Sequence, residues 1–210
     1  MLLEENDVKQ LEKKYRLNLI NSITGIKPAN LIGTRSKDGI DNVAIFSSVV
    51  HLGSNPAQLG FVMRPQTNST KDTYSNIIST GFYTINHVAR SFIKQAHYTS
   101  AKLEKEISEF DAMNLKREFI GDFFAPFVEP SPVKIGMKLV DQIELPNQCL
   151  FIVGSIHLIQ LPDKLVNDYG QLELELEQAA GIGGLNSYYA LNKLTSYPYV
   201  RINEIPDFNV

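Results

Sequence analysis

The sequence has little cysteine and no strong excess of charge of either sign, and both shortages narrow the possible functions. Cys149 is the single cysteine, so no disulfide can form within the chain, which fits a reducing compartment. The formal net charge is −3, which gives no electrostatic reason to expect nucleic acid as a partner. The first residues are acidic and polar, unlike a secretory signal, so we expect a cytoplasmic protein.

Long apolar runs and several catalytic motifs are also missing. No run approaches the roughly 20 apolar residues that a membrane-spanning helix needs, so no membrane partner is expected. The four histidines show no zinc-type spacing, and no metal site is expected. There is no nucleophile elbow and no Walker loop, and residues 181–184, Gly-Ile-Gly-Gly, lack the third glycine of a dinucleotide loop. We therefore interpret residues 181–184 as a flexible turn.

The residues that are present indicate an ordinary folded domain. Of 210 residues, 43% are hydrophobic and 20% are charged, which is enough to build a real core. No repeat, low-complexity segment or linker divides the chain. We predict a single domain over residues 1–210.

The order of predicted elements favours a mainly β fold. Apolar spacing predicts helices over 8–23, with Asp7 as a possible N-cap, and over 71–79, 91–98 and 101–118. Strands are predicted over 29–34, 42–50, 58–63, 82–86, 132–145 and 149–159, while 172–176 fits either a strand or a helix. Because short turns link most of the strands, we expect an antiparallel barrel or sandwich with peripheral helices.

Residues 42–73 carry the most chemistry. A bound phosphate needs converging N–H groups and one or two cations, and the start of a helix supplies free N–H groups. Arg64 ends a predicted strand, and Lys71 and Thr73 stand where a helix is predicted to begin. The stretch can therefore hold a phosphate, or it can be a polar helix cap with a solvated lysine.

Ser47 and Ser48 end the predicted strand that starts at Asn42. Their hydroxyls and backbone groups can bond the polar edge of a flat ring or a ribityl chain. They can equally bond nearby backbone groups at a strand end. The residue types alone leave both interpretations open.

The ordered set of motifs resembles the flavin reductase-like family of FMN-binding split barrels, which includes the flavoredoxins. The resemblance runs from about Tyr15 to Leu191 and is carried by short pieces in a fixed order. These pieces are Lys27-Pro28, Ile32-Gly33-Thr34, Asp38-Gly39, Asn42-Val43-Ala44, Ser47-Ser48, Asn55-Pro56, Met63-Arg64-Pro65, Lys71-Asp72-Thr73, Asn76-Ile77, Thr80-Gly81-Phe82, Ile85-Asn86, Ser108-Glu109-Phe110, Gly183-Gly184 and Tyr188-Tyr189.

This resemblance implies a split β-barrel, a homodimer, and FMN bound noncovalently near the dimer interface. It implies that the isoalloxazine and ribityl chain face Phe46, Ser47 and Ser48, and that Asn42 helps to orient the cofactor. It implies a phosphate site made of Arg64, Ser69, Thr70, Lys71 and Thr73. The flavin carries the hydride chemistry, so no catalytic side chain is assigned.

The residues and the family resemblance leave three functions open. The first is an FMN-dependent oxidoreductase that takes hydride from NAD(P)H, with a small molecule or a protein as the other electron partner. The second is a noncatalytic FMN-binding or electron-carrier protein like the flavoredoxins. The third is a hydrolase or other enzyme that uses the barrel without flavin.

Overall fold

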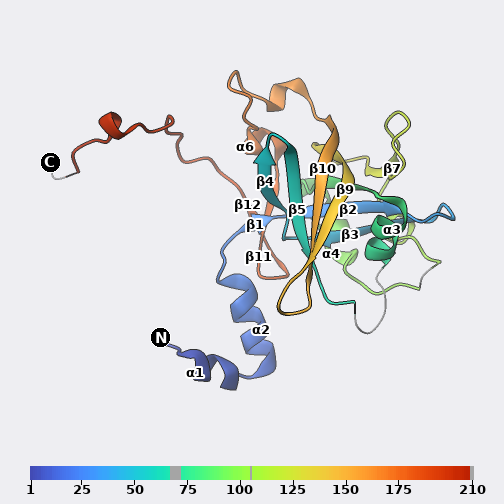
Figure 1. The fold of residues 1–210 in the computed structure, drawn as a ribbon, viewed down its shortest axis with the longest axis horizontal. Coiled ribbons are helices and arrows are strands. Elements are labelled where there is room, and N and C mark those ends of the chain that lie inside the picture. Colours follow the sequence, from blue (N-terminus) through green and yellow to red (C-terminus); the bar gives the residue numbers. More distant parts are fainter. Residues whose placement is uncertain (67–71, 105, 209–210) are drawn as a thin grey trace.

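The fold is built around one large antiparallel sheet. The computed structural model describes residues 1–66, 72–104 and 106–208. Seven strands form the main sheet in the order β3-β2-β6-β9-β10-β5-β4, with a three-stranded sheet (β1-β11-β12) and a two-stranded sheet (β7-β8) beside it (Figure 1). The strands are β1 (Lys27–Pro28), β2 (Asn30–Arg35), β3 (Asp41–Phe46), β4 (Val50–Ser54), β5 (Ala57–Met63), β6 (Phe82–His87), β7 (Arg117–Glu118), β8 (Phe127–Val128), β9 (Lys134–Glu144), β10 (Leu150–Gln160), β11 (Ala180–Gly183) and β12 (Ser187–Ala190).

The helices are short and lie around this sheet or at the N-terminal end. They are α1 (Glu5–Gln10), α2 (Lys13–Ser22), α3 (Asp72–Thr80), α4 (Ile93–Tyr98), α5 (Glu109–Ala112) and α6 (Leu174–Glu177), with 3-10 turns η1 (Arg90–Phe92), η2 (Asp163–Leu165) and η3 (Ile202–Glu204). In the described part of the chain, no helix is both long and apolar enough to cross a membrane.

The main sheet curls into a barrel because one bent stretch of chain serves both of its edges. β3 pairs with β2, with Asn30 opposite Phe46 and Thr34 opposite Asn42. After a bend at residues 47–49 the chain continues as β4, which pairs with β5 instead. Consecutive strands thus stand at the two ends of the strand order, and the barrel is split where β3 and β5 diverge.

Two apolar cores lie on opposite faces of this sheet. The first fills the barrel and includes Phe61, Tyr83 and Ile152, with Ile77 of α3 packed into the same cluster. Side chains alternate along a strand, so neighbouring residues of β2 and β3 face the other way. There Leu31 and Val43 pack with residues of η1, α4, α5 and β11, which are Phe92, Ala96, Phe110, Ala180 and Ile182.

The predicted strands agree with the structure, with two corrections. The strand predicted over 42–50 stops at Phe46, since residues 47–49 turn from one pairing partner to another. The turn predicted over 181–184 is wrong in part, because Gly181 and Gly183 lie within β11. A Cβ on Gly181 would stand 2.3 Å from Ile26 Cγ2, so glycine permits close packing there. Only Gly184, with φ of +61°, occupies the turn itself.

The helix predictions need more correction than the strand predictions. The helix predicted over 8–23 is two helices, and the second begins after Glu12, whose side chain accepts from Lys14 N and Tyr15 N. Asp7 is not an N-cap; it lies inside α1, which Glu4 caps. In the described residues, the helix predicted over 101–118 is only Glu109–Ala112. Asn114 then adopts a left-handed conformation (φ 51°), which a right-handed helix cannot continue through. Residues 172–176 contain the start of α6, so the helical alternative holds from Leu174 onward.

Candidate functional site

A cavity opens at the split in the barrel. Its volume is about 900 Å³. One wall is formed by β3 and the bend after it, the end of β5 and the start of α3. The cavity is also lined by residues 99–103, by Leu185 and Asn186 in the turn between β11 and β12, and by His97, Glu109 and Asn21.

Six of the nine residues predicted from the sequence line this one cavity. They come from β3, the bend, β5 and α3, and they are Asn42, Phe46, Ser47, Ser48, Arg64 and Thr73. The other three, Ser69, Thr70 and Lys71, lie outside the described residues. They fall in the segment between Gln66 and Asp72, both of which line the cavity.

The edge of β3 that faces away from β2 supplies backbone groups to this cavity. Val43 N points off that edge and donates to Glu109 Oε2 at 3.4 Å. Backbone groups of a strand alternate between its two edges, so the N–H and C=O of Ile45 point the same way. Ile45 also lines the cavity. The wall therefore offers one donor and one acceptor to the polar rim of a flat ligand.

Ser48 fastens the bend to β5. Its hydroxyl donates to Val62 O at 3.1 Å and accepts from Val62 N at 3.1 Å. Val62 is where the ladder between β4 and β5 would continue, two residues beyond the Val50–Gly60 pair. The side chain thus replaces the missing backbone pairing. Of the two alternatives left open by the sequence, Ser48 therefore shows the second, in which the hydroxyl bonds nearby backbone groups. Ser47 Oγ makes no hydrogen bond to any described residue, and Ser47 lines the cavity.

A buried polar network ties the start of α3 to the sheet. In the orientation that satisfies both ends of its amide, Asn42 accepts from Thr73 Oγ1 at 3.0 Å and donates to Glu109 Oε2 at 3.0 Å. Asn76 Nδ2 donates to Thr34 Oγ1 at 3.1 Å. All five side chains are buried, so each of these bonds fixes the position of a helix relative to a strand.

Glu109 is a functional candidate that the sequence reasoning did not assign. It begins α5, lines the cavity and is held against the free edge of β3. Burial raises the pKa of the Glu109 carboxyl above its ordinary value of 4.5, and the nearby charge of Asp72 raises it further. The only available signal was its place in Ser108-Glu109-Phe110, which indicated resemblance but no role.

Arg64 supplies the cationic side chain on the β5 side. It follows the last residue of β5 and is exposed at the cavity rim. Its carbonyl accepts from Gln66 Nε2 at 2.6 Å, which anchors the start of the loop. Arg64 lines the same cavity as Asp72 and Thr73, the first residues of α3.

His97, which lines the cavity, contacts Tyr188, with 3.1 Å between Nδ1 and the phenol oxygen. Burial raises the pKa of Tyr188 to about 12. Tyr188 therefore stays a neutral phenol, and it links α4 to β12.

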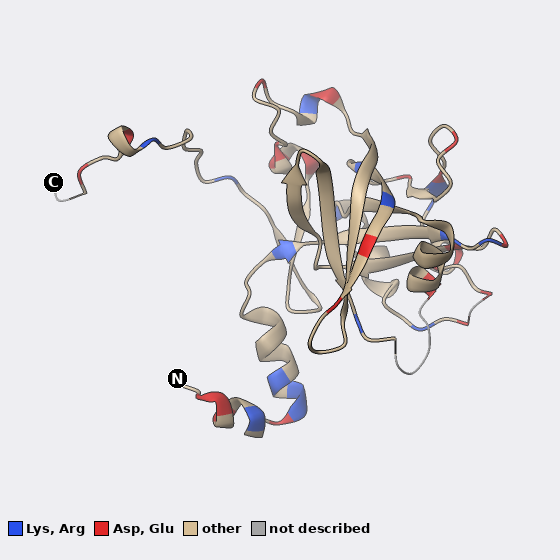
Figure 2. Ribbon diagram, in the orientation of Figure 1, with Lys and Arg blue, Asp and Glu red and all other residues tan. Residues whose placement is uncertain are grey.

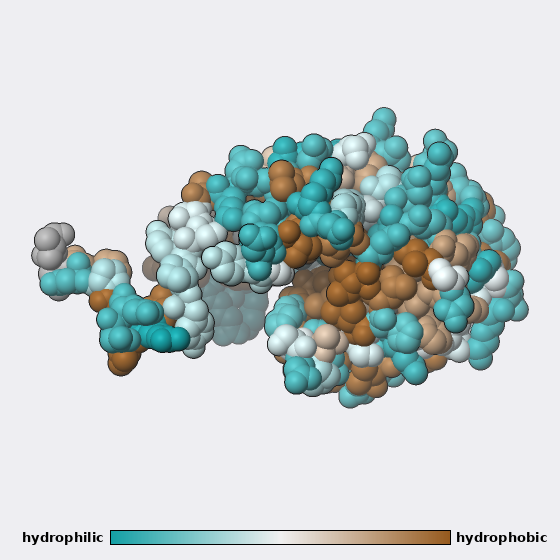
Figure 3. Space-filling model, turned by 90° about the horizontal axis from the view of Figure 1, so that it is seen from above, coloured by the Kyte–Doolittle hydropathy of each residue, from teal (hydrophilic) through white to brown (hydrophobic). Residues whose placement is uncertain are grey.

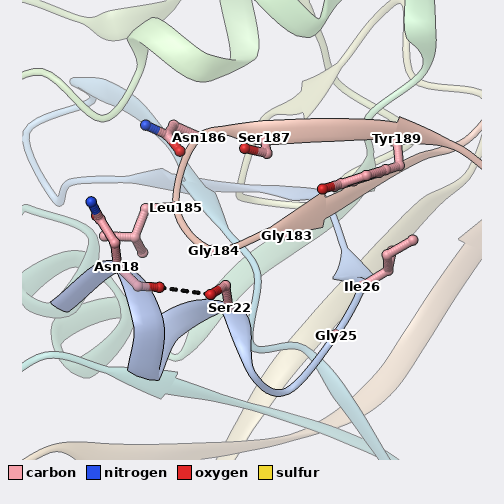
Figure 4. A pocket seen from close by; sticks show the side chains of 10 residues that line it. All are labelled: Asn18, Ser22, Gly25, Ile26, Gly183, Gly184, Leu185, Asn186, Ser187 and Tyr189. Atoms are coloured by element: carbon pink, nitrogen blue, oxygen red, sulfur yellow. Dashed lines mark hydrogen bonds between the residues drawn. The ribbon is translucent and has the colours of Figure 1, made fainter. Parts of the chain in front are cut away.

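A second, smaller cavity of about 440 Å³ lies between α2 and the β11–β12 hairpin (Figure 4). Its lining is mostly small and polar, with Asn18 and Ser22 from the helix and Asn186, Ser187 and Tyr189 from the hairpin. Leu185 and Asn186 border both cavities. None of the nine predicted site residues lines the smaller one.

Comparisons with known proteins agree with the fold. The family model described as "Flavin reductase like domain" matches residues 26–171. The crystal structure of a candidate flavin reductase with a split barrel domain from Shewanella frigidimarina NCIMB 400 is 41% identical. The match covers 95% of this chain and 100% of that one, with a TM-score of 0.90. The predicted antiparallel split barrel with peripheral helices is confirmed.

Two more distant structures share the fold. Flavoredoxin of Desulfovibrio vulgaris (Miyazaki F) is 21% identical, with 83% of this chain and 91% of that one covered and a TM-score of 0.72. Nitrilotriacetate monooxygenase component B from Bacillus cereus is 18% identical, with 94% and 98% covered and a TM-score of 0.82. The family model stops at residue 171, so β11, β12 and the segment after them lie beyond it.

The role of Ser48 as a fastener can be tested without any ligand. Ser48→Ala removes both side-chain bonds to Val62, and we expect the free energy of unfolding to fall by about 1 kcal/mol. Urea unfolding of the flavin-free protein measures this loss. Ser47→Ala is the matched control and should change stability by no more than a few tenths of a kcal/mol. Equal effects of the two substitutions would contradict the assignment.

The raised pKa of Glu109 predicts a pH dependence. The folded protein holds this proton more tightly than the unfolded chain, whose carboxyl titrates near 4.5. Stability from this group is therefore fully present below that value and is lost as pH rises through the raised pKa. Glu109→Gln stays neutral and can still accept from Val43 N. The melting temperature of this variant, relative to the parent protein, should therefore rise as pH increases above 4.5.

The control for this experiment is Glu129→Gln, at an exposed position. Its difference from the parent should stay flat across the same pH range. A Glu109→Gln difference that stayed equally flat would mean that Glu109 ionises as freely in the folded protein as in the unfolded chain.

Proposed function

The chain belongs to the flavin reductase-like family, and from that premise we propose that it binds FMN in the large cavity and acts as an oxidoreductase supplied by NAD(P)H. The observation that carries the proposal is the convergence of six predicted cofactor residues on one cavity. Those residues come from three separate segments of the chain, residues 42–48, the end of β5 and the start of α3.

The cavity fits FMN in size and in the groups it offers. Its volume of about 900 Å³ lies in the range of cofactor pockets, roughly 300–1,000 Å³. The β3 wall combines apolar side chains with free backbone groups, which suits a flat ring with a polar edge. The end near Arg64 and the start of α3 combines a guanidinium with a helix N-terminus, which suits a phosphate.

Each wall then has a defined task. Phe46, Ser47 and the edge of β3 at Ile45 would bind the ring and the ribityl chain. Arg64 would bind the phosphate, together with Ser69, Thr70, Lys71 and Thr73. Asn42 would hold the start of α3 in place through Thr73. A bound flavin supplies the hydride chemistry, and the protein excludes water and fixes the ring.

We also propose that the protein works as a homodimer. The larger cavity is open along the split between β3 and β5, and a second copy at that side would shield a bound ring from water. The same opening would admit a nicotinamide donor or a small electron acceptor.

The absorbance spectrum gives the first test. Protein purified and reconstituted with FMN should be yellow, and anaerobic addition of NADH or NADPH should bleach it within the time of turnover. A colourless protein that binds no FMN would overturn the proposal and favour an enzyme that uses the barrel without flavin. A yellow protein that neither nicotinamide bleaches would be a noncatalytic FMN-binding protein or an electron carrier.

Removing a cation from the proposed phosphate site should lower the affinity for FMN but not the affinity for riboflavin. A charge-assisted hydrogen bond to phosphate contributes about 1.5–3 kcal/mol, so Arg64→Ala or Lys71→Ala should weaken FMN binding roughly tenfold to a hundredfold. Riboflavin has no phosphate, so its affinity should hardly change. Fluorescence titration of both ligands measures the difference.

Lys37→Ala is the control, because Lys37 is an exposed cation in the turn between β2 and β3. It should leave both affinities unchanged. Losses of equal size for FMN and riboflavin would indicate a damaged fold. Unchanged FMN affinity in both Arg64→Ala and Lys71→Ala would remove these residues from the phosphate site.

A further inference from the structure

Two terminal segments leave the body of the protein on the same side. The first comprises α1 and α2. The second, which we call the arm, is residues 194–208, and it runs outward after β12 (Figure 1). Neither α1 nor α2 contains a buried residue. Both segments are therefore held by little of their own chain.

Helix α2 has too little support to be stable by itself. It is 10 residues long, and isolated helices shorter than about 12–15 residues are marginal in water. Its apolar side chains Tyr15, Leu17 and Ile20 are each more than two-fifths exposed. The helix needs an apolar surface that the body of its own chain does not supply.

The arm exposes even more apolar surface. Apart from the turn η3 it forms no helix or strand, and Figure 3 shows it standing apart from the body with brown apolar side chains along it. Seven large apolar side chains on it are more than half exposed, namely Leu194, Tyr197, Tyr199, Val200, Ile202, Ile205 and Phe208. An extended chain of this length reaches roughly 50 Å, which is enough to cross onto another molecule.

The body of the same chain carries a matching surface, the outer face of β4, β5, β9 and β10. Across these strands Phe151 stands opposite Val62 and Ile143, and Val153 stands opposite Gly60, which pairs in turn with Val50. Val50 is 46% exposed and Ile143 is 49% exposed. The strands β4, β5 and β10 contain no Lys, Arg, Asp or Glu (Figure 2). On β9 the register places one charged residue, Asp141, opposite Val153 on this face.

We propose that the arm and α2 of each copy pack against the outer sheet face of a second copy of this chain, an inference that rests on the homodimer proposed above. Both halves of the contact are present on one chain, so a two-fold arrangement satisfies both at once. The arm is rich in tyrosine and its charged residues, Arg201, Glu204 and Asp207, nearly cancel. Such a composition is typical of the buried part of a protein–protein interface.

Photo-cross-linking between differently labelled copies tests where the arm lies. Tyr199 is replaced by p-benzoylphenylalanine in full-length protein, and ¹⁴N-labelled and ¹⁵N-labelled chains are mixed and exchanged before irradiation. We expect cross-linked peptides that join the arm of one label to β4, β5, β9 or β10 of the other. Cross-links confined to one label would show that the arm folds back on its own chain and would overturn the proposal.

Tyr169 provides the matched control, since it is 90% exposed, as is Tyr199, but lies in the loop before α6. The same replacement at Tyr169 should give no product that joins two labels. Mixed-label products of equal yield from both positions would indicate random encounters and would also overturn the proposal.

A second experiment measures the dimer directly. The variant Tyr197→Ser, Tyr199→Ser, Ile202→Ser should raise the dimer dissociation constant at least tenfold in sedimentation equilibrium, whereas Tyr169→Ser should leave it unchanged. An unchanged constant for the triple variant, or a parent protein that is a monomer, would contradict the inference. Neither experiment uses flavin, so a failure here is distinguishable from a failure of FMN binding.

Discussion

Two hydrogen bonds from one serine hydroxyl hold the barrel together at the point where its backbone pairing lapses. The chain from β3 to β4 must leave β2 and join β5, so neither ladder can continue through residues 47–49. Ser48 bridges that gap by bonding both backbone groups of Val62. Because the strands diverge there, the edge of β3 stays free and the cavity of about 900 Å³ opens beside it. The same bend that closes the barrel therefore creates the site.

A second constraint fixes the helix that completes the site. The start of α3 is held by Thr73 and Asn76, which bond Asn42 of β3 and Thr34 of β2. Asn42 is in turn bonded to Glu109, so one buried network positions β3, α3 and α5 together. A buried network with satisfied partners resists small displacements. The start of α3 and the free edge of β3 can thus keep a constant separation before any ligand binds.

Six strands of the main sheet, β2, β3, β5, β6, β9 and β10, could be predicted from the sequence because each follows a local pattern. Ser47, Ser48, Arg64 and Thr73 were candidates by residue type and position, whereas Asn42 and Phe46 were expected only from the family resemblance. Alternating side chains predicted β9, and the small polar residues at strand ends predicted the cavity wall. The bend after Phe46 could not be predicted, since the residues there favour a strand and only pairing with two different partners bends them. Glu109 escaped assignment for a similar reason. Its carboxyl lies at the cavity because α5 packs Phe110 against Val43. Val43 and Glu109 are 66 residues apart in the sequence, so no local pattern indicates this contact.

A crystal structure of the protein with bound FMN tests the central claim most directly, namely that the split between β3 and β5 is the cofactor site. We expect the isoalloxazine ring of FMN along the free edge of β3, beside Ile45 and Ser47, and its phosphate between Arg64 and the start of α3. Flavin bound instead in the smaller cavity between α2 and the β11–β12 hairpin would contradict it. So would FMN bound in the larger cavity with its phosphate on residues 99–103.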